Sequence, residues 1–380
     1  MKTDRPAACS WRVSVASGWV CGLALAAAPA SAVVVQPTGG SLPTNLPSAD
    51  VFGRWGGNAA AIAVGSEWVL TNRHQDIGLV DRQVTIAGQT YDALASNQIV
   101  LDDNNDLRLV RLTDINTGAA AQLTEFAELS TVNAQGQTAL IGGFGPTIGA
   151  ALPDGFDYGG PLNNSNPLVF GQNQIDLTPN INSVIPVPGG TLELTGIETL
   201  RIDFDNPFFG GAVDFEAILG PGDSGGAFFV EQDGALRLAG LNHAITEGTA
   251  DQADAFFGQQ AFAIDLTSYA EQIERIVDQD FLSGDFNGDS IVAQADLDLV
   301  LLNFGETTRP EGWLAVDQIT GSISQDELDR VLLNFGEVDL ETLNRIAAVT
   351  GSLATVPEPS AALFLGVGAA MCAARRRRRA

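Results

Sequence analysis

The sequence predicts a mainly β protein with a small helical unit near its C-terminal end, and three observations predict it. Between about residues 52 and 262, short apolar runs alternate with Gly, Pro, Asn and Asp, a spacing typical of an antiparallel barrel or sandwich. The first run with helical spacing comes only at 266–277. A segment that begins at Asp298 then returns, with a single substitution, at Asp329.

Several apolar runs in the β region have the length and boundaries of strands. Two of them flank Gly65-Ser66 and predict a hairpin. The predicted strands are 60–64, 68–71, 84–87, 107–112, 139–142, 226–230 and 236–241. In the repeated segment, each copy predicts an amphipathic helix that ends at Gly305 or Gly336 in the left-handed conformation.

Composition limits the class of protein. Of 380 residues, 45% are hydrophobic, which is enough for a buried core in two or three domains. Acidic residues outnumber basic ones 46 to 19, and the net charge is −27. Nucleic acid is therefore excluded as a partner, because binding to a polyanion needs clustered Lys and Arg.

The two ends of the chain have the composition of targeting segments. At the N-terminus, a basic start is followed by the apolar stretch 13–28 and by Ala30-Ser31-Ala32, a small-x-small cleavage site. This pattern predicts a secretory signal peptide over residues 1–32. An uncleaved membrane anchor is the alternative, but the apolar stretch is short for one.

The C-terminal segment 356–380 contains three features in a fixed order. Pro357-Glu358-Pro359 precedes the apolar run 361–374, and the arginines 375–379 follow. This order resembles the PEP-CTERM sorting signal of Gram-negative bacteria. The resemblance implies processing by an exosortase and export through the inner membrane. It also implies transient anchoring by the C-terminal helix, followed by release to the cell surface or the extracellular matrix. Residues 339–355 are predicted to be a linker.

The most informative motif is the loop Gly220-Pro-Gly-Asp-Ser-Gly-Gly226. A serine between glycines lies in a tight turn with an accessible hydroxyl, and the neighbouring N–H groups can converge on one point. Such a serine needs a base to act as a nucleophile. The sequence contains two histidines, His74 and His243.

An acid and a base can be assigned from chain order. His74 follows a predicted strand, and Asp106 precedes another. Asp102 and Asp103 are alternative acids, but only Asp106 has the adjoining strand. The order His74, Asp106, Ser224 is one of those in which hydrolytic triads occur.

Three segments of the chain, 68–74, 105–112 and 222–226, resemble the catalytic motifs of trypsin/chymotrypsin-like serine proteases. The resemblance covers about residues 50–278. It implies two six-stranded antiparallel β-barrels and a C-terminal helix.

The resemblance also implies roles for individual residues. Ser224 would be the nucleophile, His74 the general base and Asp106 the carboxylate that orients the imidazole. The backbone N–H groups of Gly222 and Ser224 would form the oxyanion hole. No cofactor is implied for catalysis. In this family an aspartate at the position of Asp223 can pair with a newly freed N-terminus, but no Arg-Ile-Val-Gly-Gly-like segment precedes the first predicted barrel. Asp223 is therefore expected to make hydrogen bonds within its own loop.

Specificity is predicted only in part. Ile218 falls where an acidic residue would select basic P1 side chains, which argues against cleavage after Arg or Lys. His243 falls on the strand that lines the specificity pocket of this family. It is either a pocket residue or a histidine packed within the strand.

The segment 285–296 predicts a calcium site. Asp285, Asn287, Asp289 and Asp296 occupy positions 1, 3, 5 and 12 of a loop that enters a helix, and the Ile291 carbonyl lies at position 7. Six to eight oxygen ligands at this spacing suit Ca²⁺. Ser290 replaces the usual glycine at position 6. A generic Asp-rich loop is the alternative.

The duplicated unit, 283–338, resembles type I dockerin repeats. Its second copy has Val316, Gln318 and Thr320 at positions 1, 3 and 5, so a single calcium site is expected. The resemblance implies a cohesin-like partner, and a calcium-stabilised spacer is the alternative.

Taken together, the motifs predict an exported serine endopeptidase that acts on proteins or peptides through an acyl-enzyme. Two alternatives remain open. One is a catalytically inactive binding module with a protease fold, and the other is a calcium-dependent interaction protein of the dockerin type.

Overall fold

The computed structural model describes residues 33–36, 42, 44–56, 59–75, 81–146, 148–159, 166–187, 190–246, 254–279, 281–307, 310, 312–315 and 321–340. The predicted signal peptide (1–32) and sorting signal (356–380) lie outside these residues, as does nearly all of the predicted linker.

The expected localisation in a membrane has to be corrected. Within the described ranges, no helix combines the length and the apolar character that crossing a bilayer requires. The apolar run 361–374, on which the expectation depended, is not among the described residues.

The described chain is mainly β, which confirms the predicted fold class. One antiparallel sheet has eight strands. In sheet order they are β7 (Gln98–Val100), β8 (Leu107–Arg111), β4 (Trp68–Asn72), β3 (Ala59–Ala63), β2 (Phe52–Trp55), β5 (Arg82–Ile86), β6 (Gln89–Ala93) and β9 (Thr113–Asp114). The predicted hairpin is the pair β3 and β4.

A second antiparallel sheet has seven strands. In sheet order they are β13 (Val169–Gln174), β10 (Thr138–Gly143), β17 (Ala227–Gln232), β18 (Ala235–Ile245), β20 (Gln260–Asp265), β15 (Gly190–Asp203) and β14 (Asn180–Val187). Two small sheets complete the β structure: β11 (Ile148–Leu152), β12 (Gly155–Tyr158) and β19 (Asp254–Phe256) in one, and β1 (Val34–Val35) with β16 (Ala217–Ile218) in the other.

The central strands are apolar throughout because both of their faces are buried. In β3, Ala61 belongs to an apolar cluster of the first sheet, whereas Ile62 belongs to a cluster that both sheets share. In β17, Phe228 packs in a cluster of the second sheet and Phe229 in the shared one. Successive side chains of a strand point to opposite faces. The shared cluster therefore joins the two sheets.

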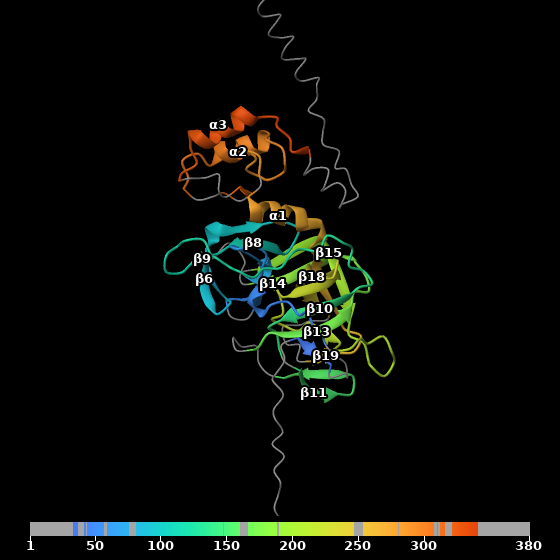
Figure 1. The fold of residues 1–380 in the computed structure, drawn as a ribbon. Coiled ribbons are helices and arrows are strands. Elements are labelled where there is room, and N and C mark those ends of the chain that lie inside the picture. Colours follow the sequence, from blue (N-terminus) through green and yellow to red (C-terminus); the bar gives the residue numbers. More distant parts are fainter. Residues whose placement is uncertain are drawn as a thin grey trace, which may run out of the picture.

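Helix α1 (Ala270–Asp278) closes the β region. It follows a 3-10 turn (Thr267–Tyr269), so the predicted helix at 266–277 begins four residues later as an α-helix. Ile273 and Ile276 pack in the shared cluster. Figure 1 shows α1 between the sheets and the remaining helices.

The repeated segments form α2 (Gln294–Leu302) and α3 (Gln325–Asn334), which begin before the repeated residues do. The two copies pair reciprocally. Gly305 N donates to Ile323 O at 2.7 Å, and Gly336 N donates to Val292 O at 2.8 Å. Both glycines have φ +92°, the left-handed stop that the sequence predicts.

Candidate active site

The loop that carries Ser224 is fixed by backbone contacts with two strands. Ser224 O accepts a hydrogen bond from Ala60 N at 2.9 Å, and Gly225 N donates to Asn242 O at 3.0 Å. Gly225 has φ +78°, and a Cβ at this position would lie 2.0 Å from the Ala60 oxygen. A side chain cannot enter this close approach, so the loop needs glycine beside Ser224.

His74 lies directly after β4, in a single 3-10 turn (Arg73–Gln75). Because β4 pairs with β8 in antiparallel fashion, Asn72 faces Leu107 at the end of the ladder. The residues beyond this pair therefore meet. His74 N donates to Asp106 Oδ1 at 2.8 Å, which places the backbone of one residue against the side chain of the other.

The structure brings the side chains of His74, Asp106 and Ser224 together. His74 Nδ1 lies 2.5 Å from Asp106 Oδ2, and His74 Nε2 lies 3.0 Å from Ser224 Oγ. Asp106 is fully buried, whereas 14% of the His74 side chain is exposed. The imidazole thus joins a buried carboxylate to a hydroxyl that solvent can approach.

Asp106 is held in its ionised form. Burial alone would raise its pKa, but the facing rings of His74 and His243 and their hydrogen bonds hold the pKa well below its usual range. An ionised carboxylate only accepts hydrogen bonds, so His74 Nδ1 carries the hydrogen. His74 Nε2 then offers its lone pair to the hydroxyl proton of Ser224 at 3.0 Å, and the more distant Gln75 Nε2 lies 3.4 Å from the same nitrogen.

The alternative acids have other contacts. The Asp102 carboxylate accepts hydrogen bonds from Asn104 N and from the Tyr269 hydroxyl, and Asp103 is exposed. Arg73 Nη1 donates to the backbone carbonyls of both residues. Arg73 therefore holds the segment that precedes Asp106 through its backbone carbonyls. The sequence does not reveal this role.

Asn105 is a supporting residue that the sequence analysis missed. Its Oδ1 accepts from Asp106 N at 2.6 Å, and its Nδ2 donates to the Tyr269 hydroxyl at 2.6 Å. Burial raises the pKa of Tyr269 to about 12, so the phenol stays neutral. The loop before Asp106 is thus attached to the start of α1.

The two residues assigned to a specificity pocket lie elsewhere. Ile218 has no exposed surface, because β16 pairs it with Val34 of β1 and its side chain packs in the core of the second sheet. The His243 ring is also fully buried, and its Nδ1 lies 2.9 Å from Asp106 Oδ2. Ile218 therefore does not line an open pocket, and of the two alternatives for His243 the buried, packed histidine agrees with the structure.

Asp223 holds the loop from inside, as the sequence predicts. Its two carboxylate oxygens accept from Gly145 N at 2.8 Å and from Gly220 N at 2.9 Å. Burial raises the pKa of Asp223 to about 7 against the opposing effect of these two hydrogen bonds.

Gly222 allows the turn that precedes Ser224. Its φ is +91°, and Asp223 N donates to Gly220 O at 3.1 Å across the turn. Among the residues that the structure describes, the N–H groups of Gly222 and Ser224 have no hydrogen-bond partner. Both donors are therefore available to a ligand.

The predicted calcium loop has a suitable set of oxygens. Asp285, Asp289 and Asp296 each supply a carboxylate oxygen, and these three atoms lie within 4.8 Å of one another. Asp285 Oδ1 is buried and has no hydrogen-bond partner among the described residues. Burial raises the pKa of Asp285 to about 6. A cation would supply the partner that Oδ1 lacks.

The other predicted ligands shape the loop through its backbone. Asn287 Oδ1 accepts from Asp289 N, and Asp289 Oδ1 accepts from Ile291 N. Asp296 Oδ2 accepts from Ala293 N at 2.8 Å and so also fixes the start of α2. These contacts wrap the chain around the position where the three carboxylate oxygens converge.

Arg275 of α1 enters this loop, and the sequence analysis missed it. Its Nη1 donates to Gly288 O at 2.9 Å and to Ser290 Oγ at 2.7 Å, and its Nη2 donates to Asp285 Oδ2 at 3.2 Å. Ser290 has φ +70°, a conformation that favours glycine. The hydroxyl of Ser290 accepts a hydrogen bond from the Arg275 guanidinium. This contact explains why serine replaces the usual glycine at this position.

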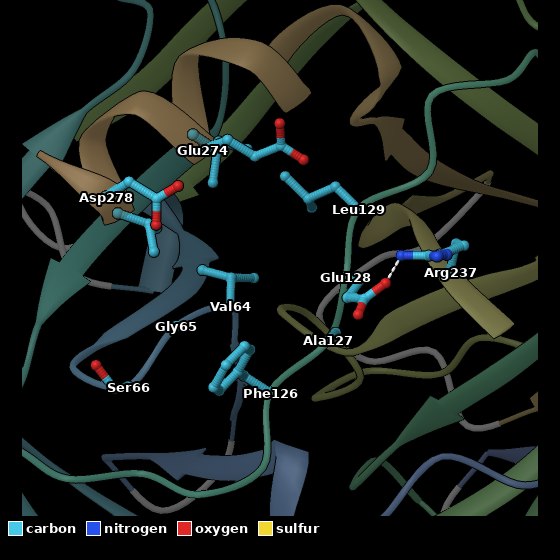
Figure 2. Close-up of a pocket in the computed structure, with 12 residues that line it drawn as sticks. Val64, Gly65, Ser66, Phe126, Ala127, Glu128, Leu129, Arg237, Glu274 and Asp278 are labelled. Atoms are coloured by element: carbon cyan, nitrogen blue, oxygen red, sulfur yellow. Dashed lines mark ion pairs between the residues drawn. The ribbon is translucent and has the colours of Figure 1, made fainter. Parts of the chain in front are cut away.

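A separate cavity of about 370 Å³ lies between the β3–β4 turn, the segment 126–129 and α1. Figure 2 shows Glu274, Asp278 and the ion pair of Glu128 with Arg237 at its wall. His74, Asp106 and Ser224 do not line it.

No family model and no curated protein matches this sequence. Among solved structures, the crystal structure of Rv3671c protease in its inactive form matches with a TM-score of 0.37 and 12% sequence identity, over 62% of this chain and 98% of that chain. The function proposed below therefore depends on the geometry of this chain.

Proposed function

We propose that this protein is a serine endopeptidase that hydrolyses peptide bonds through an acyl-enzyme at Ser224. The observation that carries the proposal is the position of one imidazole. His74 contacts the Ser224 hydroxyl at Nε2 and the ionised Asp106 at Nδ1. A serine, a base and an orienting carboxylate in this order define the class of serine hydrolases.

In the first half of the reaction, Ser224 Oγ attacks the carbonyl carbon as its proton passes to His74 Nε2. The unpartnered N–H groups of Gly222 and Ser224 stabilise the oxyanion of the tetrahedral intermediate. The C–N bond then breaks, and His74 Nε2 gives its proton to the leaving amine. Asp106 keeps the charged imidazole in place throughout this step.

In the second half, water replaces the amine. His74 Nε2 takes a proton from the water, whose oxygen attacks the acyl carbon. The Ser224 ester then breaks, and Oγ recovers the proton from His74. A carboxylic acid leaves, and the enzyme returns to its starting state.

The substrate class follows from the reaction. Proteins and peptides contain the bond that this set of groups hydrolyses. Ile218, at the position where the resemblance would place an acidic residue, is apolar and packs in the core of the second sheet, so this position presents no carboxylate to a basic P1 side chain. We therefore expect no preference for Arg or Lys.

A fluorophosphonate probe tests the nucleophile. Such a probe phosphonylates a serine only where a base activates it. We expect the wild type to be labelled and Ser224→Ala to be unlabelled. Ser66→Ala removes an exposed serine from the β3–β4 turn and is the matched control, which should be labelled like the wild type. A folded wild type that resists the probe would support the inactive binding module instead.

A second proposal concerns the repeated unit, which we infer to bind one Ca²⁺. The unpartnered Asp285 Oδ1 and the nearby oxygens of Asp289 and Asp296 support it. Asn287 and the Ile291 carbonyl would complete the ligand set. Arg275 attaches the same loop to α1, which closes the β region. The calcium-bound unit would therefore stabilise the β region through α1. The exosortase and a cohesin-like partner stay predictions.

A further inference from the structure

His243 reaches the active site because strand β18 is irregular. β18 pairs with β20 up to Asn242, and the pairing resumes at Ala244 after a register shift. His243 is thus the extra residue of a β-bulge, a feature that re-aims a side chain. Its ring is turned toward Asp106, with 2.9 Å between Nδ1 and Oδ2.

Asp106 Oδ2 therefore faces two imidazoles. His74 Nδ1 lies 2.5 Å from this oxygen, and the two ring centroids are 6.1 Å apart. The His243 side chain has no exposed surface. Within the described part of the chain, its Nε2 has no hydrogen-bond partner. Both histidines of the sequence thus converge on one carboxylate.

The chemistry of Asp106 fixes the tautomer of His243. An ionised carboxylate accepts but does not donate, so His243 Nδ1 carries a hydrogen. The buried ring therefore donates a hydrogen bond to Asp106 through Nδ1, and among the described residues its Nε2 has no hydrogen-bond partner. It contacts the carboxylate rather than Ser224, so it is not a second base.

We propose that His243 is a positioning residue that holds the Asp106 carboxylate in the orientation that His74 requires. This inference rests on the proposed peptidase function. His74 alone supplies two donors to Asp106, its backbone N–H and its ring Nδ1–H. The His243 N–H adds a third from a separate strand, which stops the carboxylate from rotating about its Cβ–Cγ bond.

Two substitutions separate the donor from the bulk of the ring. His243→Asn keeps an N–H donor on the atom bonded to Cγ, where the histidine has Nδ1. His243→Leu keeps an apolar side chain of similar size but removes the donor. A hydrogen bond to a charged group is strong enough that its loss from the transition state should lower kcat roughly 10- to 100-fold. We expect this loss in His243→Leu with KM unchanged, and recovery to within about threefold in His243→Asn.

A histidine-ring ¹⁵N–¹H spectrum gives a readout that does not depend on turnover. We expect both rings to be protonated at Nδ1 in the wild type, and Asp106→Asn to change both signals. The spectrum decides the question if His243→Leu fails to fold. A His243 ring protonated at Nε2 alone would overturn the proposal.

The kinetic outcomes distinguish this inference from the function on which it rests. A wild type that neither cleaves peptides nor reacts with a fluorophosphonate refutes the peptidase. An active wild type with an equally active, folded His243→Leu refutes only the role of His243. Equal losses in His243→Leu and His243→Asn also refute it, because they would show that packing rather than the donor matters.

Discussion

The guanidinium of Arg275 lies inside the loop that begins at Asp285, with 3.2 Å between Nη2 and Oδ2. Arg275 belongs to the helix that closes the β region, and Asp285 belongs to the repeated unit. Both side chains are almost fully buried. The two parts of the chain are therefore joined by a buried charged contact.

Removal of this arginine should destabilise the protein strongly. In Arg275→Met, Asp285 keeps its buried position but loses its cationic partner. The loss of one member of a buried ion pair typically costs about 3–5 kcal/mol of unfolding free energy. Urea unfolding measures the change, and the fluorescence of the buried Trp313 reports on the repeated unit.

Arg237→Met is the matched control, because Arg237 pairs with Glu128 at 29% and 64% side-chain exposure. An exposed pair contributes only about 0–1 kcal/mol. Similar losses of unfolding free energy in the two variants would show that the buried contact of Arg275 contributes no more to stability than an exposed ion pair does.

Calcium should stabilise the wild type. A ligand that binds only the folded state adds about 2.7 kcal/mol at a hundred times its Kd. Calorimetric titration with CaCl₂ should detect one site, and Asp289→Asn should weaken it by removing a ligand charge. Asp298→Asn on the exposed side of α2 should bind like the wild type. Absence of heat and of any shift in Tm would reject the site.

The close approach at Gly225 makes a sharp prediction. Gly225→Ala should abolish activity, because its Cβ would lie 2.0 Å from the Ala60 oxygen and displace Ser224. Gly234→Ala is the control. Gly234 has nearly the same φ, +79° against +78°, but no heavy atom lies within 4 Å of its Cβ position. Gly234→Ala should therefore cost only about 1–2 kcal/mol of backbone strain and retain activity. Equal activity in the two variants would contradict the packing described for the loop.

Stability should depend on pH through Glu216. Its oxygens accept from Asp205 N and Val213 N, and burial raises its pKa to about 7. The native state therefore binds the proton more tightly than the unfolded state. The resulting stability is fully present below the ordinary pKa of 4.5 and is lost as the pH rises through 7.

In Glu216→Gln this contribution disappears. The stability of the wild type relative to the variant should fall as the pH rises from 4.5 to 7, by at most about 1.4 kcal/mol per pH unit. Chemical denaturation across this range measures it, with the exposed Glu231→Gln as the control. A difference that is constant with pH would show that Glu216 does not titrate in this range.

The strands and motif residues could be predicted because they leave local patterns. The apolar run at 59–63 reflects burial on both faces, and the glycines around Ser224 reflect close backbone approaches. His74 and Asp106 could be selected because each adjoins a predicted strand, and the antiparallel ladder then brings them together.

The contacts that the sequence did not reveal depend on register and on distant packing. A bulge of one residue decides whether His243 faces a pocket or Asp106, and no local pattern marks the bulge. Arg275 reads as an ordinary helical residue until α1 is placed against the loop of Ser290. Ile218 is buried by a strand, at Val34, that lies far away in the chain.

The most direct test of the whole account is the rate at which the purified protein hydrolyses a fluorescently labelled, unfolded protein substrate. The wild type should release peptides, and Ser224→Ala, with the same fold and Tm, should be slower by at least about 10³-fold. Hydrolysis at the same rate in the two proteins, or a folded wild type without activity, would contradict the assignment of Ser224 as the nucleophile of a peptidase.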